Sequence, residues 1–226
     1  MEVNYAGINL RPCLFQDDIA RLADNLNAVI EGNQRTENMA ETKLLDFNLQ
    51  KSCLLIVGGQ KFRKQILDQL KSNPVKFCNY DMKRSDCEKY LGDYLSSSLS
   101  DSVFETIKRR KGHCIKLINE IKLTIEDCRG QSLGGLLTGM RIWNMAVVPF
   151  LFYNSECWVE MPNKALKILD SIQNSFFRAL FAICVGCPIP AFYWDTGSLS
   201  AKNVVIMRKL LFIHDFDNIP EDSLAK

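Results

Sequence analysis

The sequence predicts an α+β fold, with short strands and surface helices in its first part and a helical bundle in its second. Up to about residue 97, short apolar runs alternate with polar stretches of helical periodicity. Beyond that point, apolar residues recur at steps of three and four. Hydrophobic residues make up 47% of the 226 residues, enough for a sizeable core. We therefore expect two domains, residues 1–97 and 98–226.

The first strands surround a pair of acidic residues. The apolar runs INLRPCLF and IARLA flank Gln16, Asp17 and Asp18, which predicts two strands joined by a tight turn that tolerates aspartate. The stretch 25–47 that follows is polar, and its apolar residues share one helical face, which predicts a surface helix. The residues of that face are Leu26, Ile30, Ala40, Leu44 and Phe47.

Four further elements complete the first part. SCLLIV at 52–57 predicts a buried strand closed by two glycines. The segment 60–73 predicts a short helix that ends before Pro74. VKFCNYD at 75–81 and EKYLGDYL at 88–95 predict strands, the second broken at Gly92.

The second part carries four helical patterns. The first begins near Ser100 or Asp101, either of which is a suitable cap, and its apolar stripe is interrupted by Lys111. The stripe contains Phe104, Ile107, Cys114, Ile118, Ile121 and Ile125. Further helices are expected at about 132–152, from Pro162 onward and at about 200–214. Trp143, Trp158 and Trp194 are expected to pack in the core.

Composition restricts the class of protein. A formal net charge of only +2 argues against electrostatic nucleic-acid binding by the chain as a whole. No signal peptide and no apolar run of about 20 residues is visible, so we expect an intracellular protein, nuclear or cytoplasmic, that is not secreted and has no membrane partner. The nine cysteines indicate reduced thiols; Cys184 and Cys187 fit either structural cysteines near a turn or, as a weaker alternative, a zinc site.

Adjacent carboxylates such as Asp17 and Asp18 repel each other unless something neutralises them. Mg²⁺ binds hard oxygen ligands, often one or two carboxylates together with substrate phosphates. A tight hairpin would present such ligands at a rigid tip, and two metal ions can drive phosphoryl transfer. The alternative is a solvated turn, or a helix cap supplied by one aspartate.

Several segments together resemble the reverse transcriptases of non-LTR retrotransposons. LFQDDI resembles the aromatic-x-Asp-Asp motif of the palm hairpin, FNLQKSCLLIVG the palm motif that follows it, and EKYLGDYL the Tyr-Leu-Gly motif of the primer grip. PFLFYNSECW and LDSIQNSFFRALF are similar to the thumb-side helices, and GSLSAKNVVIMRKLLFIHD to the segment that closes them. The resemblance covers residues 8 to about 216, with the motifs in the family's order.

The resemblance implies part of an RNA-directed DNA polymerase, a nucleotidyltransferase that uses Mg²⁺, deoxynucleoside triphosphates, an RNA template and an RNA–DNA hybrid. Residues 1–97 would form the C-terminal half of the palm and residues 98–226 the helical thumb. Asp17 and Asp18 would be catalytic carboxylates that bind the metal, with Asp17 the direct ligand. Lys51 would act near the triphosphate as a general acid; the alternative is a surface charge.

The resemblance also assigns a primer grip. Phe15 would support the palm hairpin near the primer end. Tyr90, Leu91 and Gly92 would shape the grip, with the glycine permitting a close backbone approach. The alternative for these three residues is an ordinary edge hairpin.

The chain departs from the family's pattern in ways that bear on activity. The family has a further aspartate on an earlier palm strand and a fingers segment, whereas the sixteen residues before Asp17 contain one acid, Glu2, in no recognisable motif. Gln16 stands where alanine is usual, and Ser52 where threonine is usual. We therefore expect a fragment of a transposable-element polymerase that is inactive by itself.

A basic run lies on the first expected helix of the second part. Lys108, Arg109, Arg110 and Lys111 would contact nucleic-acid phosphates in a polymerase thumb. The alternative is a solvated helix face. The corresponding alternative for the whole chain is a non-catalytic helical module that binds nucleic acid or protein, with the acidic pair as a turn.

Overall fold

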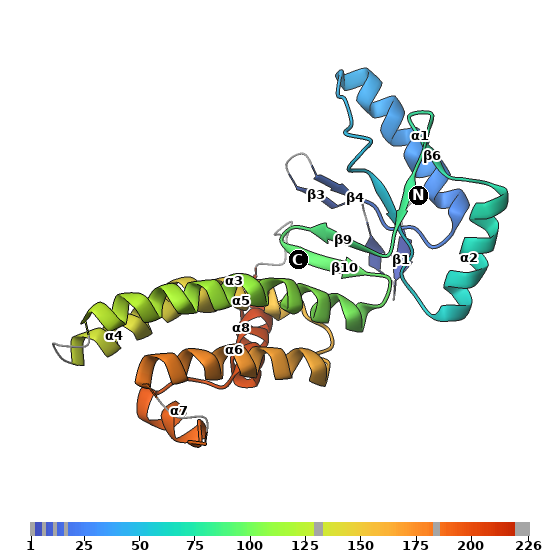
Figure 1. Ribbon diagram of the computed structural model, residues 1–226. Helices are drawn as coiled ribbons and strands as arrows, with labels where there is room; N and C mark the ends of the chain where they lie inside the picture. The colour runs from blue at the N-terminus through green and yellow to red at the C-terminus, as the bar shows by residue number, and fades with distance from the viewer. Residues whose placement is uncertain are drawn as a thin grey trace. The chain divides into compact units, whose positions relative to one another are not determined.

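The fold is mixed α+β, as predicted (Figure 1). The computed structural model describes residues 3–5, 8–10, 13–15, 18–128, 133–182 and 186–219. The chain divides into two compact units, Met1–Glu88 and Lys89–Lys226. No helix among these described residues is long and apolar enough to span a bilayer. The boundary near residue 97, as a division between palm and thumb, stays a prediction.

Two short hairpins open the first unit. Strand β1 (Val3–Tyr5) pairs antiparallel with β2 (Ile8–Leu10), and β3 (Cys13–Phe15) pairs antiparallel with β4 (Asp18–Ala20). The predicted hairpin around Gln16–Asp17 is therefore confirmed. Within the expected strand 8–15, the described residues belong to two strands, β2 and β3, each paired with a different neighbour.

Helix α1 (Leu26–Lys43) confirms the predicted helix, but its predicted apolar face is only partly the buried one: Ala40 is buried, whereas Ile30 and Leu44 are exposed. Asn25 caps its start by accepting a hydrogen bond of 2.9 Å from the Ala28 amide. Leu44 ends the helix with a φ of 53°, and 93% of it is exposed. The buried residues are Ala28, Asn33, Thr36 and Ala40. Asn33 is tolerated there because its amide donates to the Lys76 carbonyl at 2.9 Å.

The remaining elements of this unit are short. β5 (Cys53–Leu55) pairs parallel with β8 (Lys83–Ser85) and is half-buried, not buried as predicted. α2 (Gln60–Ser72) ends before Pro74, as predicted. The predicted strand 75–81 is instead a hairpin of β6 (Lys76–Phe77) and β7 (Tyr80–Asp81). Its turn residues, Cys78 and Asn79, have φ of 49° and 64°, so the chain reverses there.

The chain passes into the second unit within a hairpin, β9 (Cys87–Tyr90) and β10 (Asp93–Ser96), followed by the long helix α3 (Leu99–Cys128). α4 (Leu133–Ile142), a π-helical turn (Trp143–Val147) and α5 (Val148–Leu151) then follow without a break. The wider turn precedes Pro149, whose ring would clash with a carbonyl of an ordinary α-helical turn.

Three more helices complete this unit. After a 3₁₀ turn (Ser155–Cys157) come α6 (Asn163–Phe181), α7 (Pro190–Thr196) and α8 (Ala201–Asp217). α6 and α8 confirm predicted helices, whereas α7 was not predicted. α3 packs along α6, and Trp143 stacks on Phe176 with ring centroids 4.2 Å apart. Trp143 and Trp158 are buried as predicted, but Trp194 is 88% exposed on α7, so its predicted core position is wrong.

The thiols of Cys114 and Cys157 should differ in reactivity. Burial in the α3 core raises the pKa of Cys114 to about 11. Partial burial also raises the pKa of Cys157, but the side chain of Cys157 is exposed. Near pH 8, iodoacetamide should therefore alkylate Cys157 in the folded chain and Cys114 only after unfolding, because the thiolate is the reactive form. Peptide mass mapping after a labelling time course measures both sites. Equal labelling rates would contradict the packing of α3.

Candidate functional site

The predicted catalytic carboxylates lie at the β3–β4 hairpin. Asp18 is the first residue of β4, opposite Phe15, and its side chain is exposed. It is therefore a strand residue, not a turn residue as first expected. Asp17 and the side chain of Phe15 lie outside the described residues. The structure thus confirms the hairpin but places Asp18 in its second strand, and the roles of these residues stay predictions.

Metal binding at this hairpin also stays a prediction. Within the described part of the chain, no three histidine, cysteine, aspartate or glutamate side chains are grouped closely enough to hold a metal ion. Asp18 is the described member of the acidic pair, and Mg²⁺ usually takes one or two carboxylates together with substrate phosphates. The predicted zinc alternative at Cys184 and Cys187 is likewise untested, since Cys184 is not described.

Lys51 lies in a turn before β5. Its amide donates to the Asn48 carbonyl at 3.1 Å, and its side chain is exposed. Among the contacts of the described residues, none joins Lys51 to Asp18. An exposed ammonium at a strand start fits both the predicted general acid and the surface charge.

The predicted primer-grip residues form a tight turn between β9 and β10. Leu91 and Gly92 have φ of 47° and 88°, left-handed at both central positions as in the turns that suit twisted hairpins. Leucine rarely adopts such a conformation, so the surrounding contacts must hold it. A Cβ at Gly92 would lie 3.0 Å from the Tyr153 ring. The glycine thus allows the backbone to approach this ring closely.

Side chains of α3 satisfy the backbone of β10 at regular intervals. The Ser96 amide donates to Ser102 Oγ at 2.8 Å, and the Tyr94 amide donates to Thr106 Oγ1 at 2.8 Å. Two residues advance about 6.6 Å along a strand, and four residues advance about 6 Å along a helix. Every second residue of β10 therefore lies opposite every fourth residue of α3. The next position in this series is Arg110.

Arg110 joins three segments of this unit, and we call the residues involved the Arg110 cluster: Gly92, Asp93, Arg110, Leu151 and Tyr153. Its Nη2 donates to the Gly92 carbonyl at 3.1 Å and to Asp93 Oδ1 at 2.5 Å. Its Nη1 donates to the carbonyls of Tyr153 at 2.9 Å and Leu151 at 3.3 Å. The planar guanidinium suits such a task, because its donors point outward in a fixed fork.

This arrangement corrects one predicted site residue. Arg110 is 5% exposed and its donors are directed to protein oxygens, so it does not fit the predicted strip of phosphate contacts. Burial lowers the pKa of Arg110, although the charge of Asp93 acts to raise it. Burial likewise raises the pKa of Asp93, although the charge of Arg110 acts to lower it. Desolvation therefore offsets much of the attraction, and the pair contributes mainly geometry.

The other predicted cations remain at the surface of α3. Lys108 and Arg109 are exposed, and each lies 3.7 Å from a carboxylate oxygen of Glu105. The Arg109 guanidinium also covers the Tyr94 ring, 4.1 Å from its centroid. Lys111 is half-buried. Three cations therefore follow the helix beside the residues that hold β10.

Sequence reasoning missed Ser102 and Thr106. Their spacing was the available signal, since Ser102, Thr106 and Arg110 follow one another at intervals of four residues. The preceding strand, β10, has backbone amides that need hydrogen-bond acceptors. An arginine within a basic run gave no indication of burial.

Comparison of the chain with protein-family models, with curated proteins and with solved structures gives no match.

Replacing Arg110 with methionine should destabilise the chain by about 3 kcal/mol, because a half-buried carboxylate and three backbone carbonyls lose a donor. Urea unfolding followed by circular dichroism measures the change. Lys116→Met, at an exposed position of the same helix, is the matched control and should stay within about 0.5 kcal/mol. Similar values for both variants would contradict the assigned role.

Proposed function

We propose that this chain is the C-terminal palm and thumb part of a non-LTR retrotransposon reverse transcriptase, and that it grips the backbone of an RNA–DNA hybrid. The Arg110 cluster carries the proposal, because it fixes the Leu91–Gly92 turn beside the cations of α3. The order of elements is also consistent with the resemblance. The acidic hairpin β3–β4 is followed by α1 and then β5, and after α2, the β6–β7 hairpin and β8 the β9–β10 hairpin leads into the long helix α3.

The chemistry assigned to the described residues is binding and positioning. The exposed Gly92 in the β9–β10 turn would present its backbone to a nucleic-acid strand. Lys108, Arg109 and Lys111 would contact phosphates without reading bases. We do not propose that this chain polymerises DNA by itself. In the family that it resembles, bound Mg²⁺ stabilises the charge that develops during phosphoryl transfer.

Neutralising the α3 cations should weaken hybrid binding. In the triple alanine variant of Lys108, Arg109 and Lys111, the slope of log affinity against log salt should fall by about one unit per lost phosphate contact. Fluorescence anisotropy with a labelled RNA–DNA hybrid, measured over a salt series, tests this.

The matched control changes three exposed lysines of α2, Lys61, Lys64 and Lys71, to alanine and alters the net charge equally. This control should keep the slope of the unmodified chain. Equal losses in both variants would show that only total charge matters, and would contradict a grip on α3.

Asp17→Asn combined with Asp18→Asn separates the polymerase proposal from a non-catalytic module. If the hairpin contributes to a metal site, Mg²⁺ should strengthen hybrid binding by the unmodified chain, and the double variant should lose that response. Titration of Mg²⁺ against hybrid affinity measures it. The control, Asp81→Asn with Asp86→Asn, removes two exposed carboxylates elsewhere and should respond as the unmodified chain does. No Mg²⁺ response in the unmodified chain would favour the module.

A further inference from the structure

The outer face of α8 is apolar and exposed. The helix is held on one side by Ala201, Val204 and Val205, which are buried. Arg208 adds a hydrogen bond of 3.1 Å to the Phe152 carbonyl. Every residue from Leu210 to Asn218 is exposed, although most of these positions in the helix are apolar. A helix that is apolar beyond its packed face needs a second partner.

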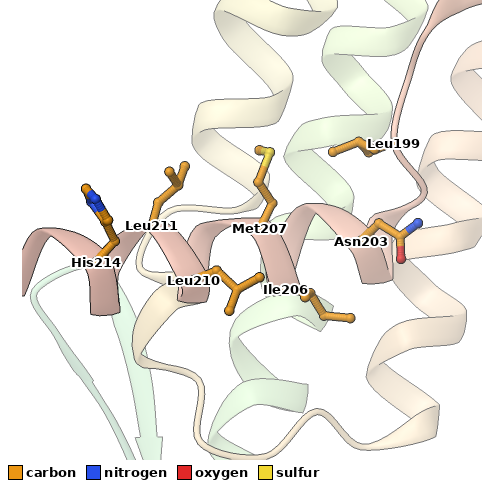
Figure 2. Close-up of a pocket in the computed structure, with 7 residues that line it drawn as sticks. All are labelled: Leu199, Asn203, Ile206, Met207, Leu210, Leu211 and His214. Carbon is orange, nitrogen blue, oxygen red and sulfur yellow. The ribbon is translucent and has the colours of Figure 1, made fainter.

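A defined stripe lies away from the packed side. We call it the α8 stripe: Asn203, Ile206, Met207, Leu210, Leu211 and His214. Figure 2 shows these side chains along the helix, with Asn203 toward one end, His214 toward the other and the apolar residues between them. With Leu199, they line an open groove. The spacing of Asn203, Met207, Leu210 and His214 is the three- and four-residue alternation of a coiled-coil seam.

We propose that the α8 stripe binds the α8 stripe of a second copy of this chain, in antiparallel orientation. The stripe is symmetric about the midpoint between Arg208 and Lys209. Met207 and Leu210 are equally far from that midpoint, and so are Asn203 and His214. A two-fold axis there would therefore pack each Met207 on the other copy's Leu210, with an asparagine and a histidine facing each other at both ends.

The charges of α8 favour the antiparallel arrangement. The first turn carries Lys202, and the last turn carries Asp215 and Asp217. Arg208 and Lys209, at the midpoint, lie near their counterparts in either orientation and so do not discriminate between the two. Antiparallel pairing brings Lys202 of one copy beside the acids of the other, whereas parallel pairing would bring like charges together. An isologous contact of this kind also closes on itself, so it yields a dimer and not a filament. The inference does not depend on the proposed polymerase function.

Sedimentation equilibrium of the full chain at several concentrations tests the proposal. The unmodified chain should fit a monomer–dimer equilibrium. Leu210→Glu should raise the dimer dissociation constant by at least about tenfold, because it places two buried carboxylates near the two-fold axis. Leu123→Glu on α3 is the matched control, since Leu123 and Leu210 are each 63% exposed, and it should leave the dimer unchanged. Circular dichroism verifies that both variants are folded.

Charge reversal tests the orientation. Lys202→Asp should raise the dissociation constant about twofold to fivefold, and adding Asp217→Lys should restore it. A chain that remains a monomer at all concentrations would overturn the proposal, as would a dimer that Leu210→Glu leaves intact. A dimer that the double reversal fails to restore would overturn the antiparallel arrangement.

Discussion

The buried guanidinium of Arg110 is the contact on which the geometry of the candidate site depends. It connects the β9–β10 turn, helix α3 and the segment after α5 through four hydrogen bonds to oxygens. Of the contacts that α3 makes with this hairpin at every fourth helical residue, the one from Arg110 holds the backbone next to Leu91, whose conformation is left-handed. Burial lowers the pKa of Arg110 and raises that of Asp93, so it opposes the charged form of each. The ion pair therefore fixes the positions of these segments more than it adds net stability.

The helical unit combines two surfaces with different chemistry. On α3, cations lie beside a hairpin whose backbone is fixed by side chains at every fourth helical position. On α8, an apolar stripe lies beyond the part of the helix that packs on its own unit. The first surface suits a phosphate backbone and the second suits another apolar helix. The two proposed interactions therefore use different helices and can be removed separately.

Much of the fold follows from local sequence. Helices α2, α6 and α8 were predictable because their apolar spacing and boundary residues agree, as with Ser200, which caps α8 by accepting from the Asn203 amide. The buried face of α1 was only partly predictable, because Asn33 is buried through a hydrogen bond to the Lys76 carbonyl that depends on tertiary structure. The role of Arg110 was hidden for the same reason: two of its acceptors lie 41 and 43 residues away. The acidic hairpin itself was predictable, but Asp18 was expected in the turn and lies in β4, and Asp17 is outside the described residues.

Amide hydrogen exchange of the chain, alone and with an RNA–DNA hybrid, tests most directly whether the Arg110 cluster builds a nucleic-acid grip. In the free chain, the Tyr94 and Ser96 amides should exchange slowly, because Thr106 and Ser102 accept from them. Adding hybrid should slow exchange in the peptide that contains Leu91 and Gly92. Rapid exchange at Tyr94 and Ser96 would contradict the packing of β10 on α3. Protection by hybrid confined to segments other than this turn and α3 would contradict the grip.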